Sequence, residues 1–323
     1  MKAMLVASDL SLIWSDVPDF EPVPGHILIK TVCAGVNRAD LLQRAGKYPP
    51  PPGAPEWMGL EISGTVAALG EGCTRFAVGD AVCALLPGGG YAEYALVPEQ
   101  QVMPIPEGLS FVQAASLPEA FATAWLNLFI EAGLISGDTC CITAGSSGLA
   151  SAAIQLAHAK GLRVLTSVRR EEAVDYCYSI GADVVVNTSR TSLATAFQAE
   201  LDRGTPVKGV MDCLGGSDMG ECLPLMAYGG RWVMIATLAN ADTNVNLTAM
   251  YKRGLRLIGS TLRPRPVEVK GQILASLVSE IWPLLTAGSI RPQIQAVFPI
   301  TEAEAAHDVL QRGGHHGKVI LQL

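Results

Sequence analysis

The chain has 323 residues and a formal net charge of −7, with 49% hydrophobic and 16% charged residues. This length predicts two domains or one large one, and the composition is typical of a compact globular protein. A negative charge without a basic stripe argues against nucleic acid as the main partner. No apolar run reaches the length of a transmembrane helix, because charged residues, Pro or Gly interrupt each candidate.

The N-terminal residues and the cysteines predict a cytoplasmic protein. The first residues lack a sustained signal-peptide core and soon reach Asp9 and Asp16. The eight cysteines show no CxxC spacing and mostly lie in apolar contexts, which is typical of reduced thiols.

Residues 1–118 are predicted to be mostly β. Alternating apolar segments separated by Gly and Pro turns predict strands near 26–33, 64–70, 80–86 and 91–97. We expect these strands to form a twisted, partly closed barrel.

From residue 110 onward the period changes, and strands alternate with helices. Strands are predicted near 139–143, 162–167, 182–187, 209–213, 230–236 and 255–259. This alternation predicts a doubly wound parallel sheet of the Rossmann type. The tail is predicted to hold helices over 267–288 and 302–312 and strands over 294–299 and 318–323, and to return to the first domain. We therefore expect a substrate domain of residues 1–118 plus 262–323, with a nucleotide domain of 119–261 inserted into it.

A turn of small residues follows the strand at 139–143 and precedes a helix. It predicts contacts to the pyrophosphate of a dinucleotide from Ala144, Gly145, Ser147 and Gly148. A full GxGxxG is absent, and an ordinary strand–helix–strand crossover without a ligand is the alternative.

The residues that end the next strand favour NADPH over NADH. NAD enzymes place an acidic residue there, whereas this chain has Ser167, Arg169 and Arg170, which are suited to a 2′-phosphate. The alternative is that the arginines begin a solvated helix, although helix starts prefer Asp and Glu.

Further along, the carboxyl ends of two predicted strands should line the cofactor cleft. These positions hold Cys213, Gly215, Ala236 and Thr237. Adjacent Cys140 and Cys141 point to opposite faces of a strand, so we expect buried core residues rather than a disulfide.

Several longer motifs extend over the whole chain. They read GVNRADLLQR (35–44), GKYPPPPG (46–53), GLEISG (59–64), LLPGGGYAEY (85–94), MPIPEG (103–108) and GKVIL (317–321). With these motifs the chain resembles, end to end, the quinone oxidoreductase branch of the zinc-free medium-chain dehydrogenase/reductase superfamily. Within that branch it is most similar to the tumour-suppressor-inducible quinone oxidoreductase-like group. The resemblance implies a Rossmann domain inserted into a GroES-like domain.

The same resemblance implies that no catalytic metal is bound. Zinc alcohol dehydrogenases of the superfamily carry Cys where Asn37 stands and His where Leu60 stands, and they have a four-cysteine lobe that this chain lacks. We interpret His307, His315 and His316 as surface or helix-end residues rather than ligands. A quinone is already electrophilic, so loss of the metal fits a quinone acceptor.

By resemblance, Asn37 and Tyr48 are the candidate catalytic residues. Tyr48 is expected to donate to the acceptor oxygen, with loop packing as the alternative; Asn37 is expected to bind the nicotinamide side or the substrate, with satisfaction of the backbone as the alternative. The resemblance also implies cofactor contacts from Thr123, Leu262, Arg263 and Lys318. Relatives hold the 2′-phosphate with a lysine and a tyrosine, where this chain has Glu172 and Thr188.

The predicted activity is hydride transfer from NADPH to a quinone. One alternative is an NADPH-dependent 2-enoyl thioester or enone reductase, and another is a low-turnover, NADPH-binding, crystallin-like protein. The resemblance implies a homodimer or a dimer of dimers, paired through edge strands of the nucleotide domains.

Overall fold

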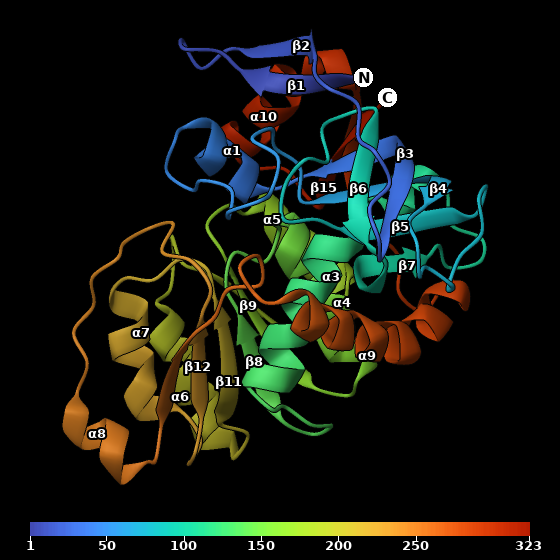
Figure 1. Ribbon diagram of the computed structural model, residues 1–323. Coiled ribbons are helices and arrows are strands. Elements are labelled where there is room, and N and C mark those ends of the chain that lie inside the picture. Colours follow the sequence, from blue (N-terminus) through green and yellow to red (C-terminus); the bar gives the residue numbers. More distant parts are fainter. The chain divides into compact units, whose positions relative to one another are not determined.

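The structure is a computed structural model that describes residues 1–323 and divides the chain into two compact units (Figure 1). The first unit comprises Met1–Ala122 and Leu262–Leu323, and the second comprises Thr123–Thr261. The second unit is therefore an insertion between two segments of the first. No helix is both long and apolar enough to cross a membrane.

The first unit is built on a seven-stranded sheet and a separate hairpin. The sheet order is β14-β15-β3-β4-β5-β7, with β6 also paired to β3, and β1 pairs with β2. In β3 the period-2 pattern of the sequence buries Ile27 and Ile29 and exposes Lys30, as expected for a strand with one core face. The strands are β1 (Lys2–Val6), β2 (Leu12–Asp16), β3 (His26–Val36), β4 (Glu61–Leu69), β5 (Ala81–Leu85), β6 (Tyr94–Pro98), β7 (Val102–Pro104), β14 (Ile294–Pro299) and β15 (Lys318–Gln322).

Four helices belong to this unit. They are α1 (Arg38–Arg44), α2 (Phe111–Ala114), α9 (Val267–Thr286) and α10 (Ala303–Arg312). Short 3₁₀ turns cover Glu99–Gln101 and Ile300–Glu302. α10 packs against β14 and β15, and α9 packs against the turn at Glu99–Gln101. The predicted mostly β character of this part is confirmed.

The second unit is a six-stranded parallel sheet in the order β10-β9-β8-β11-β12-β13 (Figure 1). The predicted doubly wound sheet is confirmed, because this is the strand order 3-2-1-4-5-6 of a dinucleotide-binding fold. Cys140 and Cys141 on β8 are free and fully buried, as expected. The strands are β8 (Thr139–Ile142), β9 (Arg163–Val168), β10 (Val184–Asn187), β11 (Val207–Asp212), β12 (Arg231–Met234) and β13 (Arg256–Gly259).

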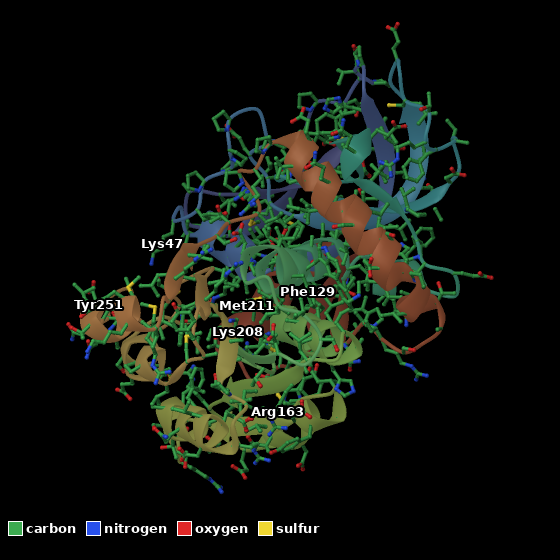
Figure 2. The ribbon with its side chains drawn as sticks, turned by 90° about the horizontal axis from the view of Figure 1, so that it is seen from below. Lys47, Phe129, Arg163, Lys208, Met211 and Tyr251 are labelled. Carbon is green, nitrogen blue, oxygen red and sulfur yellow. The ribbon has the colours of Figure 1, made fainter.

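Helices connect these strands. α3 (Pro118–Trp125) leads into a π-helical turn at Leu126–Glu131, and the later helices are α4 (Gly148–Ala159), α5 (Glu172–Ser179), α6 (Leu193–Arg203), α7 (Ser217–Cys222) and α8 (Leu247–Lys252). A further 3₁₀ turn covers Leu223–Leu225. Arg163 (Figure 2) forms a two-pronged ion pair with Glu200 on α6, with N···O distances of 2.7 and 2.9 Å. This pair ties the start of β9 to α6, the third element after it along the chain.

Candidate functional site

The turn after β8 lies where the strand order of the sheet reverses. β9 is on one side of β8 and β11 on the other, and the carboxyl ends of parallel strands border a crevice at such a point. Ala144 has a left-handed backbone (φ +57°), and a Cβ atom on Gly145 would lie 2.3 Å from Oγ1 of Thr166 on β9. Residue 145 must therefore be glycine for the turn to pass this close to β9.

The first turn of α4 offers unused hydrogen-bond donors. The Ser147 hydroxyl accepts from the Ala150 N–H at 3.2 Å, and Ser151 N donates to Ser147 O at 2.8 Å. The backbone N–H groups of Gly148 and Leu149 donate to no group of the chain. Because free N–H groups at a helix start attract phosphate, this turn fits a dinucleotide's pyrophosphate.

The loops that follow β9 and β10 bring three arginines together. Arg169 and Arg170 are exposed after β9, and the Arg169 carbonyl accepts from the Ser189 hydroxyl at 2.7 Å. Arg190, which the sequence reasoning missed, pairs with Glu171 at 3.2 Å. The strand order, which places β10 beside β9, is the signal that would have found it. Glu171 therefore places a carboxylate among these arginines. The Asn187 side chain also donates to this carboxylate, at 2.7 Å.

The other residues expected near a 2′-phosphate, Ser167 and Thr188, are uncharged and lie at the ends of β9 and β10. Ser167 is buried within β9, at 3% exposure. Thr188 donates from its hydroxyl to the Val168 carbonyl at 3.2 Å, which fastens the end of β10 to the end of β9. Both lie at the predicted edge of the sheet.

The carboxyl end of β11 is organised by a buried aspartate that the sequence reasoning also missed. Asp212 is 2% exposed and accepts from Thr143 Oγ1 at 3.0 Å, Trp232 Nε1 at 3.1 Å and Leu214 N at 2.8 Å. These bonds fix the backbone that carries Cys213, whose own N–H donates to Thr143 Oγ1 at 3.0 Å.

A hollow of about 200 Å³ lies beyond this strand end. Of the predicted cofactor contacts, Gly215 and Thr237 both line it, together with Trp232 and Met234 of β12. Gly215 has φ +71°, and a Cβ there would lie 2.3 Å from the Asn240 carbonyl, so this position also requires glycine. Ala236 directly precedes Thr237 in the same loop after β12. The structure thus brings these predicted residues to one edge of the sheet.

Thr123 lies in α3, just before the π-helical turn. Its carbonyl accepts from Nδ2 of Asn127 at 2.7 Å, and Asn127 is 2% exposed. A π turn interrupts the regular hydrogen bonds of a helix, and here the buried Asn127 side chain bonds to the Thr123 carbonyl just before that turn.

In the first unit, the half-buried Asn37 forms a polar cluster with the buried Glu61 and Lys318. The Asn37 amide donates to Glu61 Oε1 at 2.9 Å and its carbonyl accepts from Lys318 Nζ at 2.7 Å. Lys318 also donates to Glu61 and to the Val36 carbonyl, which uses all three of its N–H groups. The Asn37 amide also donates to the Gly35 carbonyl at 3.4 Å, which is a backbone contact of the kind that the alternative expects. The expected catalytic role of Asn37 and the expected cofactor contact of Lys318 stay predictions.

Asp40 joins this cluster to a second buried group. Its carboxylate accepts from Asn37 N at 2.7 Å, Gly59 N at 3.0 Å and the Tyr91 hydroxyl at 3.2 Å. Burial raises the pKa of Asp40 to about 6, against the lowering effect of these hydrogen bonds and of Lys318.

The second partner of the Tyr91 hydroxyl is His307, whose Nε2 lies 3.3 Å away. The interpretation of His307 as a surface or helix-end residue is wrong, since it is 1% exposed in the middle of α10. Burial lowers the pKa of His307 to about 4. The imidazole is therefore neutral near pH 7.

Tyr48 lies in the loop after α1 with the Arg263 guanidinium above its ring, 4.9 Å from the ring centroid. Arg263 also donates to the Tyr48 carbonyl at 3.3 Å, to Pro87 O at 2.6 Å and to Gln43 Oε1 at 2.7 Å. The expected cofactor contact of Arg263 therefore stays a prediction, and its partners in the structure are helix α1 and two loops of its own unit. Leu262, the residue before it, is 5% exposed.

The donor set around Asn37 does not fit a tetrahedral zinc ion. The Asn37 carboxamide is already bonded on both of its polar atoms, and Leu60 has an apolar side chain that is 2% exposed. No group of three or more His, Cys, Asp or Glu side chains gathers in the structure so that it would hold a metal ion.

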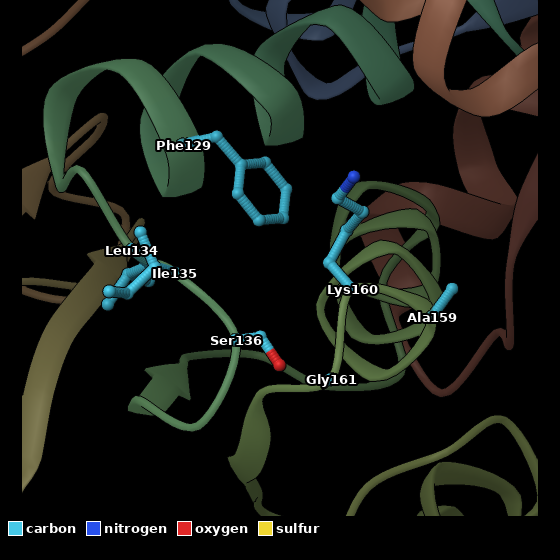
Figure 3. A pocket seen from close by; sticks show the side chains of 7 residues that line it. All are labelled: Phe129, Leu134, Ile135, Ser136, Ala159, Lys160 and Gly161. Carbon is cyan, nitrogen blue, oxygen red and sulfur yellow. The ribbon is translucent and has the colours of Figure 1, made fainter.

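A larger hollow, of about 530 Å³, lies at the opposite edge of the second sheet (Figure 3). It is lined mainly by apolar residues that precede β8 and β9, among them Phe129, Leu134 and Ile135, with Lys160 at its side. Because it faces the amino ends of the strands, it is separate from the Gly145 turn.

Two family models match the chain. Residues 23–107 match the alcohol dehydrogenase GroES-like domain, and residues 148–278 match the zinc-binding dehydrogenase family. The class defined by this fold is an oxidoreductase with a nucleotide-binding sheet inserted in a GroES-like domain. The chain belongs to the medium-chain dehydrogenase/reductase superfamily, whose members typically use NAD(P).

Among its relatives are quinone oxidoreductases. The quinone oxidoreductase of Sus scrofa is 31% identical over 312 residues, which cover 96% of this chain and 92% of that protein. The crystal structure of the quinone oxidoreductase from Thermus thermophilus, solved also with NADPH, has a TM-score of 0.83 at 30% identity, with both chains fully covered. A mycobacterial protein complexed with NADPH has a TM-score of 0.85 at 26% identity, also with both chains fully covered.

Proposed function

We propose that the protein is a zinc-independent, NADPH-dependent quinone oxidoreductase of the tumour-suppressor-inducible quinone oxidoreductase-like branch. The observation that carries the proposal is the closed cluster of Asn37, Glu61 and Lys318 at the position where zinc relatives bind their metal. Without a Lewis acid, an ordinary carbonyl is difficult to polarise. A quinone is electrophilic already and needs placement and a proton source.

The second unit supplies the groups that would hold NADPH. The N–H groups of Gly148 and Leu149 are suited to the pyrophosphate, and the exposed Arg169 and Arg170 are suited to the 2′-phosphate. The nicotinamide half would lie beside residues that follow β11 and β12, of which Gly215 and Thr237 line the hollow there and Cys213 and Ala236 directly precede Leu214 and Thr237. When bound, NADPH supplies the hydride that is transferred to the acceptor.

Tyr48 is the proposed proton donor. Addition of hydride to a quinone leaves one oxygen as an anion, which must gain a proton to give the hydroquinone. Burial raises the pKa of Tyr48, against a lowering effect of Arg263, so its hydroxyl keeps its proton at neutral pH. The hydroxyl donates to no group of the chain and is therefore available to the acceptor. Water then returns the proton to Tyr48.

We also propose a homodimer formed through β13, which can assemble further into a dimer of dimers. β13 ends its sheet and pairs only with β12, and large apolar side chains are exposed on it and on α8, including Leu257 (39%) and Tyr251 (70%; Figure 2). Light scattering should give the mass of a dimer or tetramer, and Leu257→Lys should shift it towards the monomer. Ile13→Lys, on the exposed face of β2, is the control and should not change the mass.

We further propose a cytoplasmic location, which agrees with the eight free cysteines.

The central experiment follows nicotinamide absorbance with metal-stripped protein. NADPH and NADH are offered separately, with 1,2-naphthoquinone or a crotonyl thioester as acceptor. The proposal expects oxidation of NADPH by the quinone, faster than oxidation of NADH. Thioester reduction without quinone reduction would make the protein an enoyl reductase instead. NADPH binding without turnover of either acceptor would favour a cofactor-binding, crystallin-like protein.

A further inference from the structure

Arg263 is a buried cation without a carboxylate partner. Its side chain is 6% exposed, and its hydrogen bonds all go to neutral oxygens, namely the carbonyls of Pro87 and Tyr48 and the side-chain amide of Gln43. Burial lowers the pKa of Arg263 from its ordinary value. Because burying an unpaired guanidinium is unfavourable, its retention here calls for a role beyond packing.

The partners of Arg263 come from helix α1 and from two separate loops, so one guanidinium holds these three segments together. Gln43, which accepts from Nη2 of Arg263, donates through its own amide to the Glu56 carbonyl at 2.9 Å. On the Pro87 side, Trp57 donates to the Gly89 carbonyl at 2.9 Å. Arg263 thus links α1 and the Tyr48 loop to Pro87, and Trp57 bonds directly to the same Pro87 loop at Gly89.

The guanidinium also lies against the Tyr48 ring itself. Its carbon atom is 4.9 Å from the ring centroid, which is within the range of a cation–π contact. Among the charged groups near Tyr48, Arg263 favours the tyrosinate and Glu119 opposes it. Asp40 and Glu119 raise the pKa of Arg263, and Arg263 in turn lowers the pKa of the buried Lys270. Arg263 is the cation in direct contact with the Tyr48 ring.

We propose that Arg263 is a positioning residue for Tyr48: it fixes the orientation of the ring and stabilises the negative charge that Tyr48 gains on giving up its proton. The inference rests on the proposed function in that Tyr48 is its proton donor. The Tyr48 O–H bond breaks as a new O–H bond forms on the reduced acceptor, and the tyrosinate left beside Arg263 takes a proton from water. The role differs from the cofactor contact expected from the sequence.

The test compares Arg263→Met, Arg263→Lys, Tyr48→Phe and the Arg263→Met/Tyr48→Phe double variant. Arg263→Met should lower kcat with naphthoquinone about tenfold, because the donor is held less well. It should leave the Kd for NADPH, measured by fluorescence titration, unchanged. In the double variant kcat should be no lower than in Tyr48→Phe alone. Arg263→Lys should have a higher kcat than Arg263→Met. Arg44→Met, on the same helix as Gln43, is the control and should leave kcat unchanged.

A second readout does not depend on turnover. The ultraviolet absorbance of tyrosinate, taken as the difference between each protein and its Tyr48→Phe counterpart, reports the pKa of Tyr48. Arg263→Met should raise that pKa relative to the parent. An unchanged pKa together with additive kcat losses would overturn the inference, as would weaker NADPH binding as the main defect. If the parent protein reduces no quinone, the proposed function fails, and the Tyr48 titration still decides whether Arg263 stabilises the tyrosinate.

Discussion

The Lys318 ammonium lies 2.5 Å from a carboxylate oxygen of Glu61, and both side chains are shut off from solvent, at 5% and 0% exposure. Lys318 begins β15, Glu61 begins β4, and β3 lies between these strands in the sheet. The ion pair therefore spans a strand. Because each charge is buried, each depends on the other.

Lys318→Met should destabilise the protein by about 3–5 kcal/mol, because it leaves the Glu61 carboxylate buried without its cation. Urea unfolding measures the change. Lys2→Met, which removes a surface pair with Asp16, is the control and should change stability by less than about 1 kcal/mol. A small loss for Lys318→Met would mean that the remaining donors, the Asn37 amide and the Glu119 N–H, compensate Glu61.

The pH dependence of stability should contain two opposing contributions. Asp40 has a folded pKa of about 6 against an ordinary 3.8, so the unfolded chain loses this proton first and stability falls as pH rises from about 4 to 6. His307 has a folded pKa of about 4 against an ordinary 6.5, so stability rises between about 4 and 6.5. Each effect is of the order of 3 kcal/mol, and they nearly cancel.

Single variants separate these contributions. Relative to the parent protein, His307→Gln should make unfolding free energy fall more steeply between pH 4 and 6.5, and Asp40→Asn should make it rise more steeply. Urea midpoints at several pH values within that window provide the measurement. Parallel profiles for both variants and the parent would contradict the assigned pKa shifts.

Glu171 should weaken the preference for NADPH, because it already pairs with Arg190 where the 2′-phosphate is expected. Glu171→Gln should tighten NADPH binding a few-fold, whereas Arg169→Gln/Arg170→Gln should weaken it about tenfold or more. NADH binding should change little in either variant. Fluorescence titration gives the Kd values, with Arg203→Gln on α6 as the control; equal effects on both coenzymes would place the 2′-phosphate elsewhere.

Gly145→Ala should destabilise the second unit and abolish tight NADPH binding. The added Cβ would lie 2.3 Å from Thr166 Oγ1 and 2.9 Å from Cys177 Sγ, so the turn must move away from β9. Thr166→Ala in the same chain should restore part of both properties. Gly259→Ala, where nothing lies within 4 Å, is the control for unfolding. Normal NADPH binding by Gly145→Ala would show that the turn is not the pyrophosphate site.

Much of the second unit was predictable because buried strands are short apolar runs between turns, and each predicted strand lies within a few residues of β8 to β13. The local sequence does not state which strand lies beside which. Arg190 was missed for that reason, since its relation to Glu171 depends on β10 pairing with β9.

The site of the first unit was harder to predict because its contacts join distant positions. Asn37 was identified by its place in a motif, but its partner Lys318 lies 281 residues away, and the sequence does not reveal that the two bond to each other. The sequence predicts that His307 is a surface or helix-end residue, whereas Ala303, Ala306 and His307 share the buried side of α10. Its partner Tyr91 is 216 residues away.

The connectivity of the first unit also constrains how the molecule is made. Lys318 is synthesised 257 residues after Glu61, and β15, which covers one edge of β3, leaves the ribosome after the whole inserted sheet. The inserted unit is continuous in sequence, and all of its strands, β8 to β13, are synthesised before β14 and β15. Until β15 is synthesised, part of one edge of β3 in the first unit has no strand partner, and the Glu61 carboxylate lacks its cation. Nascent chains paused before residue 318 should therefore be the ones that chaperones and proteases recognise.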